Sequence, residues 1–596
     1  MGVSRRMRKR VNIDTDVLII GGGTAGCLAA WEARQVGGPG LRITILERAN
    51  IRHSGSLAAG QNALNAYINQ GTPEDWVAYV RYDLCGAPVR EDILLSVGRE
   101  LNETVAMMEK QGLPIKKDAD GRYLARGKWN IEVNGRFLKP ITSKMADLAG
   151  AQVLNWVYVT ELIKKDNRCA GAVGFGARDG RLYVVRAKAV LVATGGAAGI
   201  WRPRYGGDAH HRIWYVPFNT GASYAMMKRI GAEMTGFDTR MIPVRIKDTY
   251  APAGTLAIGA NAPMVNALGE VFMLEKEEYI RMGGHTAPTP VRVWACYREI
   301  AGGRGPIFMD TTKGDPEKVA GLREQYLDMS PSTVLYWGAH DIDPAREPIE
   351  IEGDSPFLVG AHAACCGAWT IGTTRMTTVP GLFASGEALG QAPSRFISGS
   401  WTCGRIAGRN MVGWITRNGV ELAELDPEEI ARLEEITFAP TARWAGQDVY
   451  TNGKPVMGIM PKEMEEQMQN IMEDYCGGRV RHFSVSDPYL EIARKRINRL
   501  RRDQLKYLTA SDLFELQQAW DVINRLDCCQ LAIEHISYRK ETRFLGYVNR
   551  TDYPERNDAE YDCFICSVWN PDTDELTFHK YPYEQIVPGS RTQETI

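Results

Sequence analysis

The sequence predicts an α/β fold: a Rossmann-like domain, interrupted by an inserted α+β segment and followed by a mainly helical C-terminal domain. Two stretches predict this class. In the first, an apolar strand at 17–20 leads into a glycine-rich turn, an Ala-rich helix at 27–34 and a second apolar strand that ends at Glu47. In the second, an apolar strand at 189–194 leads into Gly195 and Gly196. Strand, glycine turn and helix in this order are typical of dinucleotide-binding domains.

Each residue type in the first turn suits the binding of a dinucleotide. Gly21 permits the tight turn, Gly23 lets backbone amides approach a pyrophosphate, and Gly26 allows the helix to pack closely on the strand. Glu47 lies 21 residues beyond the last glycine, where an acid can bind ribose hydroxyls. We therefore predict cofactor contacts from these four residues and from Thr24, Ala25, Arg48, Thr194, Gly195 and Gly196.

Composition limits the possible partners. The 596 residues include 71 basic and 72 acidic side chains, so nothing favours nucleic acid as a partner. No apolar run reaches the 18 residues that a membrane-spanning helix needs. The 12 cysteines lack the spacing of a disulfide framework, so we expect reduced thiols and a cytoplasmic protein.

The chain divides into four expected segments. Small-residue and apolar patterns place the first part of the dinucleotide-binding domain at 11–247 and the second at 358–425, with an α+β capping segment at 248–357 between them. Apolar stripes at helical spacing predict helices at 99–111, 461–475 and 511–536. Because the last two lie within residues 426–596, we expect that segment to form a helical domain with a tail. A β-rich run at 151–162 predicts one strand.

Several motifs carry a family resemblance. They are the small-residue loop at 51–65, the arginine-rich blocks at 201–248 and 539–558, and the Gly-Leu-Phe-Ala-Ser-Gly-Glu run that ends at Glu387. Together they resemble the flavoprotein subunit family of succinate dehydrogenase and fumarate reductase, most closely its adenylylsulfate reductase alpha branch. The resemblance spans nearly the whole chain and implies FAD as cofactor.

The resemblance also implies how the flavin is held. Where the succinate dehydrogenase branch has a Ser-His pair that carries covalent FAD, this chain has Ser54-Gly55, followed by Ser56. We therefore expect non-covalent FAD, although His53 lies one position earlier. Glu387 is expected near the ribityl chain. Ser398 and Ser400 open a helix whose positive N-terminus suits the pyrimidine edge of reduced flavin.

Family matching places four residues at the reaction centre. It puts Arg245 opposite the sulfate of the substrate, Trp214 near the flavin, Asn65 near its reactive edge, and His362 in the active site. The implied reaction is reduction of adenosine 5′-phosphosulfate to sulfite and AMP, or the reverse, through a flavin N5–sulfite adduct. A related enzyme that acts on another small anion remains an alternative.

Two alternatives remain open. The first is a fumarate reductase-like enzyme for a small carboxylate, but this chain has Trp294 where that branch places its proton-donating arginine. The second is an electron-transfer flavoprotein subunit without a substrate of its own. Arginines that converge on the flavin would favour a substrate site, whereas arginines that project into solvent would favour the carrier.

Metal ligation is not expected in this chain. The adjacent His210 and His211 lack Cys or His partners at ligand spacing, and no C-x2-C-x2-C-x3-C run for an iron–sulfur cluster occurs. The Cys365-Cys366 and Cys563-x-x-Cys566 pairs are expected to pack in the core, with a redox or metal role left open. The absence of an iron–sulfur run, together with the family resemblance, implies a hetero-oligomer with a ferredoxin-like iron–sulfur subunit, which could form a peripheral link to membrane electron transport.

Overall fold

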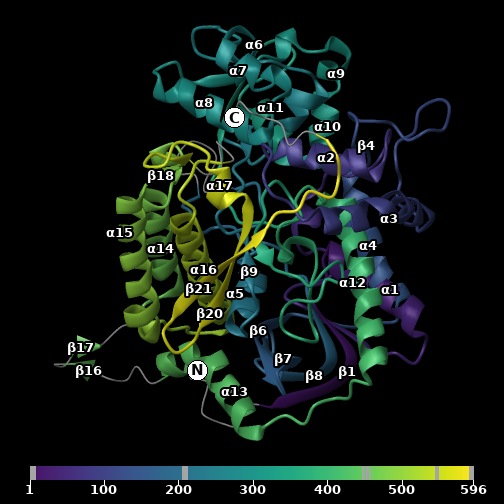
Figure 1. The fold of residues 1–596 in the computed structure, drawn as a ribbon, viewed down its shortest axis with the longest axis vertical. Helices are drawn as coiled ribbons and strands as arrows, with labels where there is room; N and C mark the ends of the chain where they lie inside the picture. Colours follow the sequence, from purple (N-terminus) through teal and green to yellow (C-terminus); the bar gives the residue numbers. More distant parts are fainter. Residues whose placement is uncertain are drawn as a thin grey trace.

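The computed structural model describes residues 9–203, 213–445, 450–451, 454–455, 458–543 and 549–589. Within these residues, a seven-stranded sheet has the order β5-β2-β1-β8-β7-β6, and β15 pairs with β8. The strands are β1 (Arg10–Ile20), β2 (Ile43–Glu47), β5 (Gln152–Asn155), β6 (Val157–Lys165), β7 (Arg168–Gly176), β8 (Leu182–Val192) and β15 (Leu382–Ala384). Figure 1 shows the capping segment above this sheet and the C-terminal helices beside it. The predicted α/β class is confirmed.

The C-terminal end of the first strand is buried on both faces. β1 pairs in parallel with β2 and β8, and its residues Val17 to Ile20 are at most 2% exposed. Val17 and Ile19 pack into one core cluster, whereas Leu18 and Ile20 pack into another. A parallel sheet covered on both faces explains why this segment is continuously apolar rather than alternating.

Two helices cover one face in unusually close contact. α1 (Thr24–Gly37) follows the glycine turn, and α12 (Phe396–Asn418) crosses it from far along the chain. A Cβ atom on Gly404 would lie 2.2 Å from the Ala25 carbonyl oxygen, and one on Gly408 would lie 2.3 Å from that of Ala29. Glycines at these two positions therefore let the helix backbones touch beside the turn.

The strand expected at 151–162 is divided. β5 and β6 lie on opposite edges of the main sheet, and the chain turns between them at Trp156, whose φ is +65°. The guanidinium of Arg178 lies 3.6 Å from the centroid of the Trp156 ring and covers it. The prediction of one strand was wrong because β-rich composition extends through this turn without a glycine or proline to mark it.

The capping segment has a sheet of its own, in the order β10-β13-β12-β11. Its strands are β10 (Val244–Ile246), β11 (Met264–Val265), β12 (Ile307–Met309) and β13 (Ile349–Gly353), and its helices are α6 (Phe272–Glu275), α7 (Glu277–Arg281), α8 (Thr289–Ala301), α9 (Pro316–Ala320), α10 (Leu322–Met329) and α11 (Pro331–Ala339). β10 already pairs with β13 before the boundary expected at 248. The segment therefore enters and leaves through adjacent strands.

A buried carboxylate organises this segment. The side chain of Glu299 is fully buried and accepts hydrogen bonds from Lys276 at 2.7 Å and from Arg304 at 2.6 Å, besides bonds from Asn266 and Tyr279. Burial opposes its ionisation, but these bonds outweigh burial and lower the pKa of Glu299 to about 2. Arg304 is therefore a structural residue.

We predict that Glu299→Gln destabilises the capping segment by about 2–3 kcal/mol, because charge-assisted hydrogen bonds are lost. The folded pKa lies below the ordinary value of 4.5. The stabilisation should therefore be complete above that value and be lost as pH falls toward 2. Hydrogen exchange of the α8 amides measures the stability of the capping segment. Glu278→Gln removes an exposed ion pair with Arg298 and is the matched control; equal effects of the two variants would contradict the prediction.

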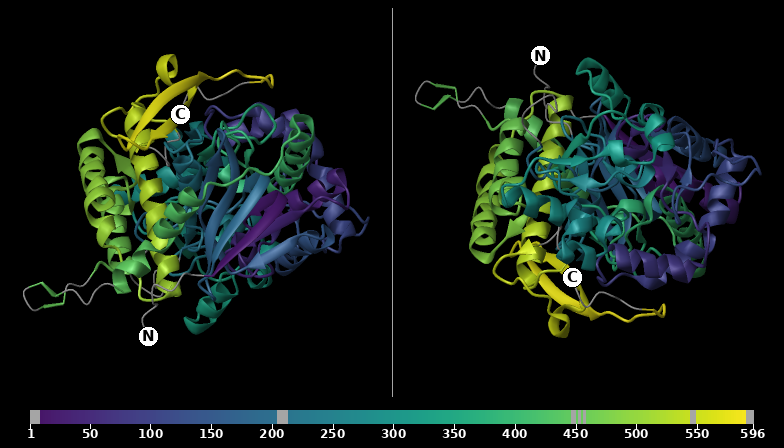
Figure 2. Two further views of the ribbon diagram at one scale, coloured as in Figure 1. Left: turned by 90° about the horizontal axis from the view of Figure 1, so that it is seen from below. Right: turned by 90° about the horizontal axis from the view of Figure 1, so that it is seen from above.

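The C-terminal part is a helical layer with a β-hairpin. Figure 2 shows the helices of residues 461–538 side by side on one flank. The helices of this part are α13 (Pro427–Ala445), α14 (Pro461–Tyr475), α15 (Asp487–Arg499) and α16 (Leu513–Tyr538), and the hairpin is β20 (Cys563–Asn570) with β21 (Glu575–Pro582). The hairpin forms a sheet with β9 (Met234–Thr235) and β14 (Gly367–Ala368). The C-terminal part is therefore joined to both halves of the predicted FAD-binding domain.

The remaining elements lie either in the domain that carries the glycine turn or in the C-terminal part. They are α2 (Pro73–Asp83), α3 (Glu91–Lys110), α4 (Leu138–Leu148), α5 (Ala222–Arg229), α17 (Asp558–Tyr561) and the short strands β3 (Ala63–Leu64), β4 (Ile131–Glu132), β16 (Tyr450–Thr451), β17 (Lys454–Pro455), β18 (Ser484–Val485) and β19 (Asn549–Arg550). Among the described residues, no helix is long and apolar enough to cross a membrane.

Candidate functional site

The glycine turn between β1 and α1 has the geometry that its sequence predicts. Gly21 has a φ of +103°, and a Cβ atom there would lie 2.5 Å from the Ala193 carbonyl oxygen. A Cβ atom on Gly26 would lie 2.0 Å from the carbonyl oxygen of Gly21. On Gly23, by contrast, its nearest neighbour would be 3.9 Å away. Gly21 and Gly26 are therefore required by the fold, whereas Gly23 borders open space that a ligand can enter.

A cavity of about 1220 Å³ opens at this turn. It exceeds the roughly 300–1,000 Å³ typical of ligand pockets, and so it can hold an extended dinucleotide. Most of the predicted site residues line it. These are Gly21, Gly23, Thr24, Ala25, Glu47, Arg48, Ser54, Gly55, Ser56, Asn65, Thr194, Gly195, Trp214, His362, Glu387 and Ser400.

The remaining predicted residues lie one layer behind the wall. Gly26 packs α1 against the turn, the amide of Gly196 donates to the Tyr215 hydroxyl at 3.0 Å, and the Ser398 hydroxyl donates to the Ala66 carbonyl. Arg245 is also outside the wall, as described below.

Glu47 and Arg48 are held in place at the end of β2. The carboxylate of Glu47 accepts from the amides of Gly22 at 2.8 Å and Ala49 at 2.9 Å. Arg48 forms two hydrogen bonds to Asp521 of α16, at 2.8 and 2.7 Å. Asp521 also lines the cavity. A residue from the C-terminal layer thus completes the wall, and no local motif in the sequence marks it.

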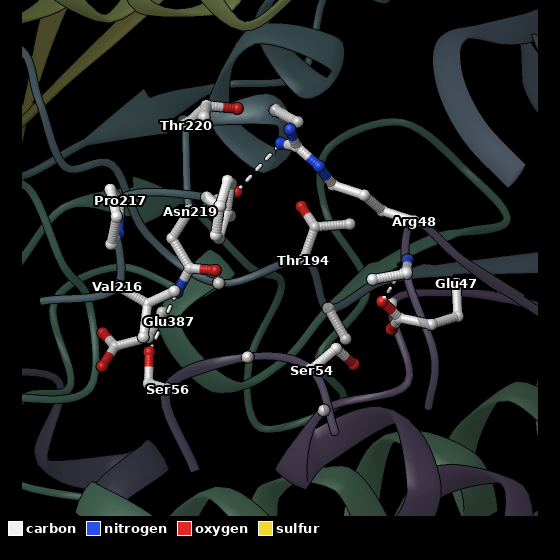
Figure 3. Close-up of a pocket in the computed structure, with 18 of the residues that line it drawn as sticks. Glu47, Arg48, Ser54, Ser56, Thr194, Val216, Pro217, Asn219, Thr220 and Glu387 are labelled. Atoms are coloured by element: carbon white, nitrogen blue, oxygen red, sulfur yellow. Dashed lines mark hydrogen bonds between the residues drawn. The ribbon is translucent and has the colours of Figure 1, made fainter. Parts of the chain in front are cut away.

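Several polar groups face the cavity. Figure 3 shows Glu47, Arg48, Ser54 and Thr194 around one space, with Asn219 donating to Ser56 at 3.0 Å. The buried Thr194 hydroxyl has no hydrogen-bond partner among the described residues, so it is available to a ligand. The glycine turn, the acid at the end of β2 and the available hydroxyl together fit a bound FAD.

One end of the cavity is aromatic. The ring of His362 lies edge-to-face between Trp214, at 5.2 Å between centroids, and Phe396, at 4.7 Å. Asn65 lines the same cavity. Burial lowers the pKa of His362 to about 3, so the imidazole is neutral at neutral pH. It therefore offers a hydrogen bond rather than a charge to a ligand. Phe396 was missed because its role depends on its φ of +44° at the start of α12.

Glu387 is held from behind by backbone amides. Its Oε2 accepts from Gly360 at 2.7 Å and Ala361 at 2.6 Å, in the loop that also carries His362. Burial raises the pKa of Glu387, although these amides and the charge of Arg395 oppose the rise. The carboxyl group thereby links the end of β15 to the loop of His362.

Arg245 and Trp214 are linked through one buried carboxylate. Asp354, which follows β13, accepts from the Trp214 amide at 3.0 Å and lies 3.2 Å from Nη2 of Arg245. The side chains of Arg245 and Asp354 are 0% and 1% exposed. Arg245 is central in β10, and its guanidinium lies beside the carboxylate that holds the Trp214 amide. Its expected contact with substrate remains a prediction.

Other predicted features fall outside the cavity wall. Trp294 packs against Tyr279, at 6.0 Å between ring centroids, and under Arg298. All twelve cysteines are buried and free, and no cluster of three potential metal ligands occurs in the part of the chain that the structure describes. Cys366 donates to the carbonyls of Gly236 and Thr239 in the core. His210 and His211 lie outside the described residues.

Comparisons with known proteins agree with this geometry. The family model "FAD binding domain" matches residues 16–396, and "Fumarate reductase flavoprotein C-term" matches residues 465–593. The chain is 32% identical to the adenylylsulfate reductase subunit alpha of Megalodesulfovibrio gigas, over 97% of this chain and 96% of that protein.

Two solved structures are similar over nearly the whole chain. One is adenylylsulfate reductase from Archaeoglobus fulgidus, and the other is an adenosine-5-phosphosulfate reductase in complex with sulfite as a covalent adduct. Each is 36% identical, has a TM-score of 0.91 and covers 98% of both chains. The expected family is thereby confirmed: the chain belongs to the FAD-dependent oxidoreductases of the succinate dehydrogenase and fumarate reductase flavoprotein family, and it resembles the alpha subunit of adenylylsulfate reductase.

Proposed function

We propose that this protein is the catalytic flavoprotein of an adenylylsulfate reductase, interconverting adenosine 5′-phosphosulfate with sulfite and AMP. One observation carries the proposal: Asn65, Trp214 and His362 line the cavity that begins at the glycine turn, in a chain similar to such reductases over nearly its full length. Bound FAD supplies the two-electron redox chemistry. The protein's own residues bind the anion, exclude water and hold the reacting groups together.

The aromatic end of the cavity provides the binding geometry. Trp214 and Phe396 pack edge-to-face against His362 and hold it in one orientation. The neutral imidazole can donate one hydrogen bond to an oxyanion, and the Asn65 amide can donate another. The N-terminus of α12, where Ser400 lines the cavity, adds the positive end of a helix dipole. These are fixed dipoles of the kind that stabilise developing negative charge.

The position of Arg245 argues against a simple electron carrier, for which arginines that project into solvent are expected. Its guanidinium is fully buried and lies beside Asp354, which binds the Trp214 amide. Trp294, by contrast, packs within the capping segment and provides no proton donor to the cavity. A small carboxylate substrate is therefore the weaker alternative.

The activity is tested with the FAD-loaded protein and a reduced dye as electron donor. We expect adenosine 5′-phosphosulfate to be converted to sulfite and AMP in equal amounts, and His362→Ala to lower the rate at least tenfold. Leu335→Ala, an exposed change on α11 outside the cavity wall, is the control. Fumarate turnover without release of sulfite would refute the proposal.

We further propose that FAD is bound non-covalently. Ser54 and Gly55 line the cavity and offer no attachment side chain, but His53 lines it as well. Acid precipitation should release all flavin into the supernatant, and His53→Ala should retain FAD. Flavin fluorescence that stays with the denatured protein, and disappears in His53→Ala, would show attachment at His53.

An iron–sulfur partner completes the proposal. The sequence has no iron–sulfur cysteine run, and the buried cysteines form no cluster among the described residues. Electrons must then reach the flavin from another protein, so we propose a ferredoxin-like subunit in a hetero-oligomer. Purification from the native host should yield a complex with bound iron. A monomer that exchanges electrons at full rate with free nicotinamide would disprove this.

A further inference from the structure

A buried cysteine on α12 lies between two buried arginines. Sγ of Cys403 accepts a hydrogen bond from Nε of Arg375 at 3.3 Å and from Nη1 of Arg395 at 3.2 Å. All three residues are 0% exposed. Sulfur is thus the atom at which two guanidinium groups converge.

The other contacts of the two arginines are to neutral acceptors. Arg375 donates to the Thr373 carbonyl at 2.6 Å and the Ser96 hydroxyl at 2.8 Å. Arg395 donates to the carbonyls of Gly360 at 3.0 Å and Leu389 at 2.8 Å, besides that of Ala392. Neither forms an ion pair with a carboxylate in the described ranges. Two full charges without a counter-charge are unfavourable in a protein interior.

The neighbouring carboxyl groups are engaged elsewhere. Asp92 forms a hydrogen-bonded ion pair with Arg90, and the carboxyl of Glu387 accepts from the amides of Gly360 and Ala361. Both lie within electrostatic reach of the arginines. The thiol is therefore the group left to carry the opposing charge.

The chemistry of thiols supports this reading. Burial opposes ionisation of Cys403, but Arg375, Arg395 and the Ser385 hydroxyl outweigh it and lower the pKa of Cys403 to about 6. Cys169 is equally buried but has no such partners, and burial raises its pKa to about 12. The two cysteines provide a matched comparison within one chain.

We propose that Cys403 is held as a thiolate and forms, with Arg375 and Arg395, a charge triad that sets the electrostatic potential behind the cofactor cavity. Residues next to the triad line the cavity at two places. Arg395 immediately precedes Phe396 and Ile397, which line the cavity, and Ser400 lies one helical turn before Cys403. Gly360, whose carbonyl binds Arg395, donates its amide to Glu387 of the wall.

The triad would tune the cofactor without touching it. Its net charge is plus one, because one thiolate offsets one of two guanidinium groups. Removing the thiolate charge would make this wall more positive and would favour reduced flavin, which is more negative than oxidised flavin. Cys403 is therefore a positioning and tuning residue, and the inference does not depend on which substrate the enzyme uses.

The ionisation state is tested by infrared spectroscopy of the S–H stretch in the FAD-loaded protein at neutral pH. Cys403→Ser should leave the S–H band area unchanged, since a thiolate has no S–H bond, whereas Cys169→Ser should lower it. Equal losses in the two variants would overturn the proposal. If Cys403→Ser does not fold, Cys403→Asp, which keeps a negative charge, gives the same spectral test.

The electrostatic role is tested by the flavin midpoint potential. We expect the potential to rise in Cys403→Ser and to return toward the wild-type value in Cys403→Asp, while Cys169→Ser leaves it unchanged. Equal shifts in the Ser and Asp variants would show a packing effect and would contradict the triad. The triad would also be contradicted if the Cys403→Ser variant folds and the Cys403→Asp variant does not.

Discussion

Gly26→Ala is expected to prevent stable folding of the FAD-binding domain. Gly23→Ala, by contrast, is expected to leave the apoprotein stable and to weaken the binding of FAD. A methyl group at position 26 would lie 2.0 Å from a backbone oxygen that cannot yield without moving β1 or α1. Overpacking of this severity destabilises by about 3 kcal/mol or more. At position 23 the same methyl group has no protein atom nearer than 3.9 Å, and it borders the cavity.

Urea unfolding of the apoproteins and titration with FAD separate these effects. Gly23→Ala should unfold at the wild-type urea concentration but bind FAD at least tenfold more weakly, which corresponds to about 1.4 kcal/mol. Equal stability of the Gly26→Ala and wild-type apoproteins would contradict the close packing of α1. Unchanged FAD affinity in Gly23→Ala would place the pyrophosphate elsewhere.

Arg245→Ala is expected to lower the free energy of unfolding by about 3–5 kcal/mol, because it leaves the Asp354 carboxylate buried without its ion-pair partner. Asp354 holds the amide of Trp214, so the same change should also loosen the aromatic end of the cavity and weaken sulfite binding. Asp354→Asn keeps a side chain of the same shape and removes the charge.

A double-mutant cycle distinguishes two roles of Arg245. If it acts through Asp354, the losses of sulfite affinity in Arg245→Ala and Asp354→Asn should be strongly non-additive. Additive losses, with Trp214 fluorescence unchanged, would instead mean that Arg245 contacts the anion directly. Wild-type stability of Arg245→Ala would contradict the buried ion pair.

The cofactor half of the site could be predicted from sequence because its determinants are local. Gly21, Gly23 and Gly26 act within one turn, and Glu47 follows at a spacing that the strand and helix dictate. The helix over 461–475 was predicted with the bounds that the structure shows, since proline begins it and an apolar stripe runs along one face.

Residues that act across the chain could not be predicted in this way. Asp521 reaches Arg48 from 473 positions away, and Asp354 reaches Trp214 from 140 positions away. Neither position has a motif of its own, because an isolated aspartate next to apolar residues is common. Cys403 likewise gains Arg375 only when α12 folds against the loop before β15, whereas Arg395 directly precedes α12 and lies only eight positions from Cys403.

Addition of sulfite to the oxidised, FAD-loaded protein tests the central claim most directly. We predict that millimolar sulfite bleaches the flavin absorbance band, that AMP binds alongside and raises the melting temperature, and that His362→Ala weakens the bleaching. Bleaching without any response to AMP would remove adenylylsulfate as the substrate while keeping a sulfite-reactive flavin. An unbleached flavin that, once reduced by a dye, turns over fumarate or another unsaturated carboxylate would contradict the proposed function.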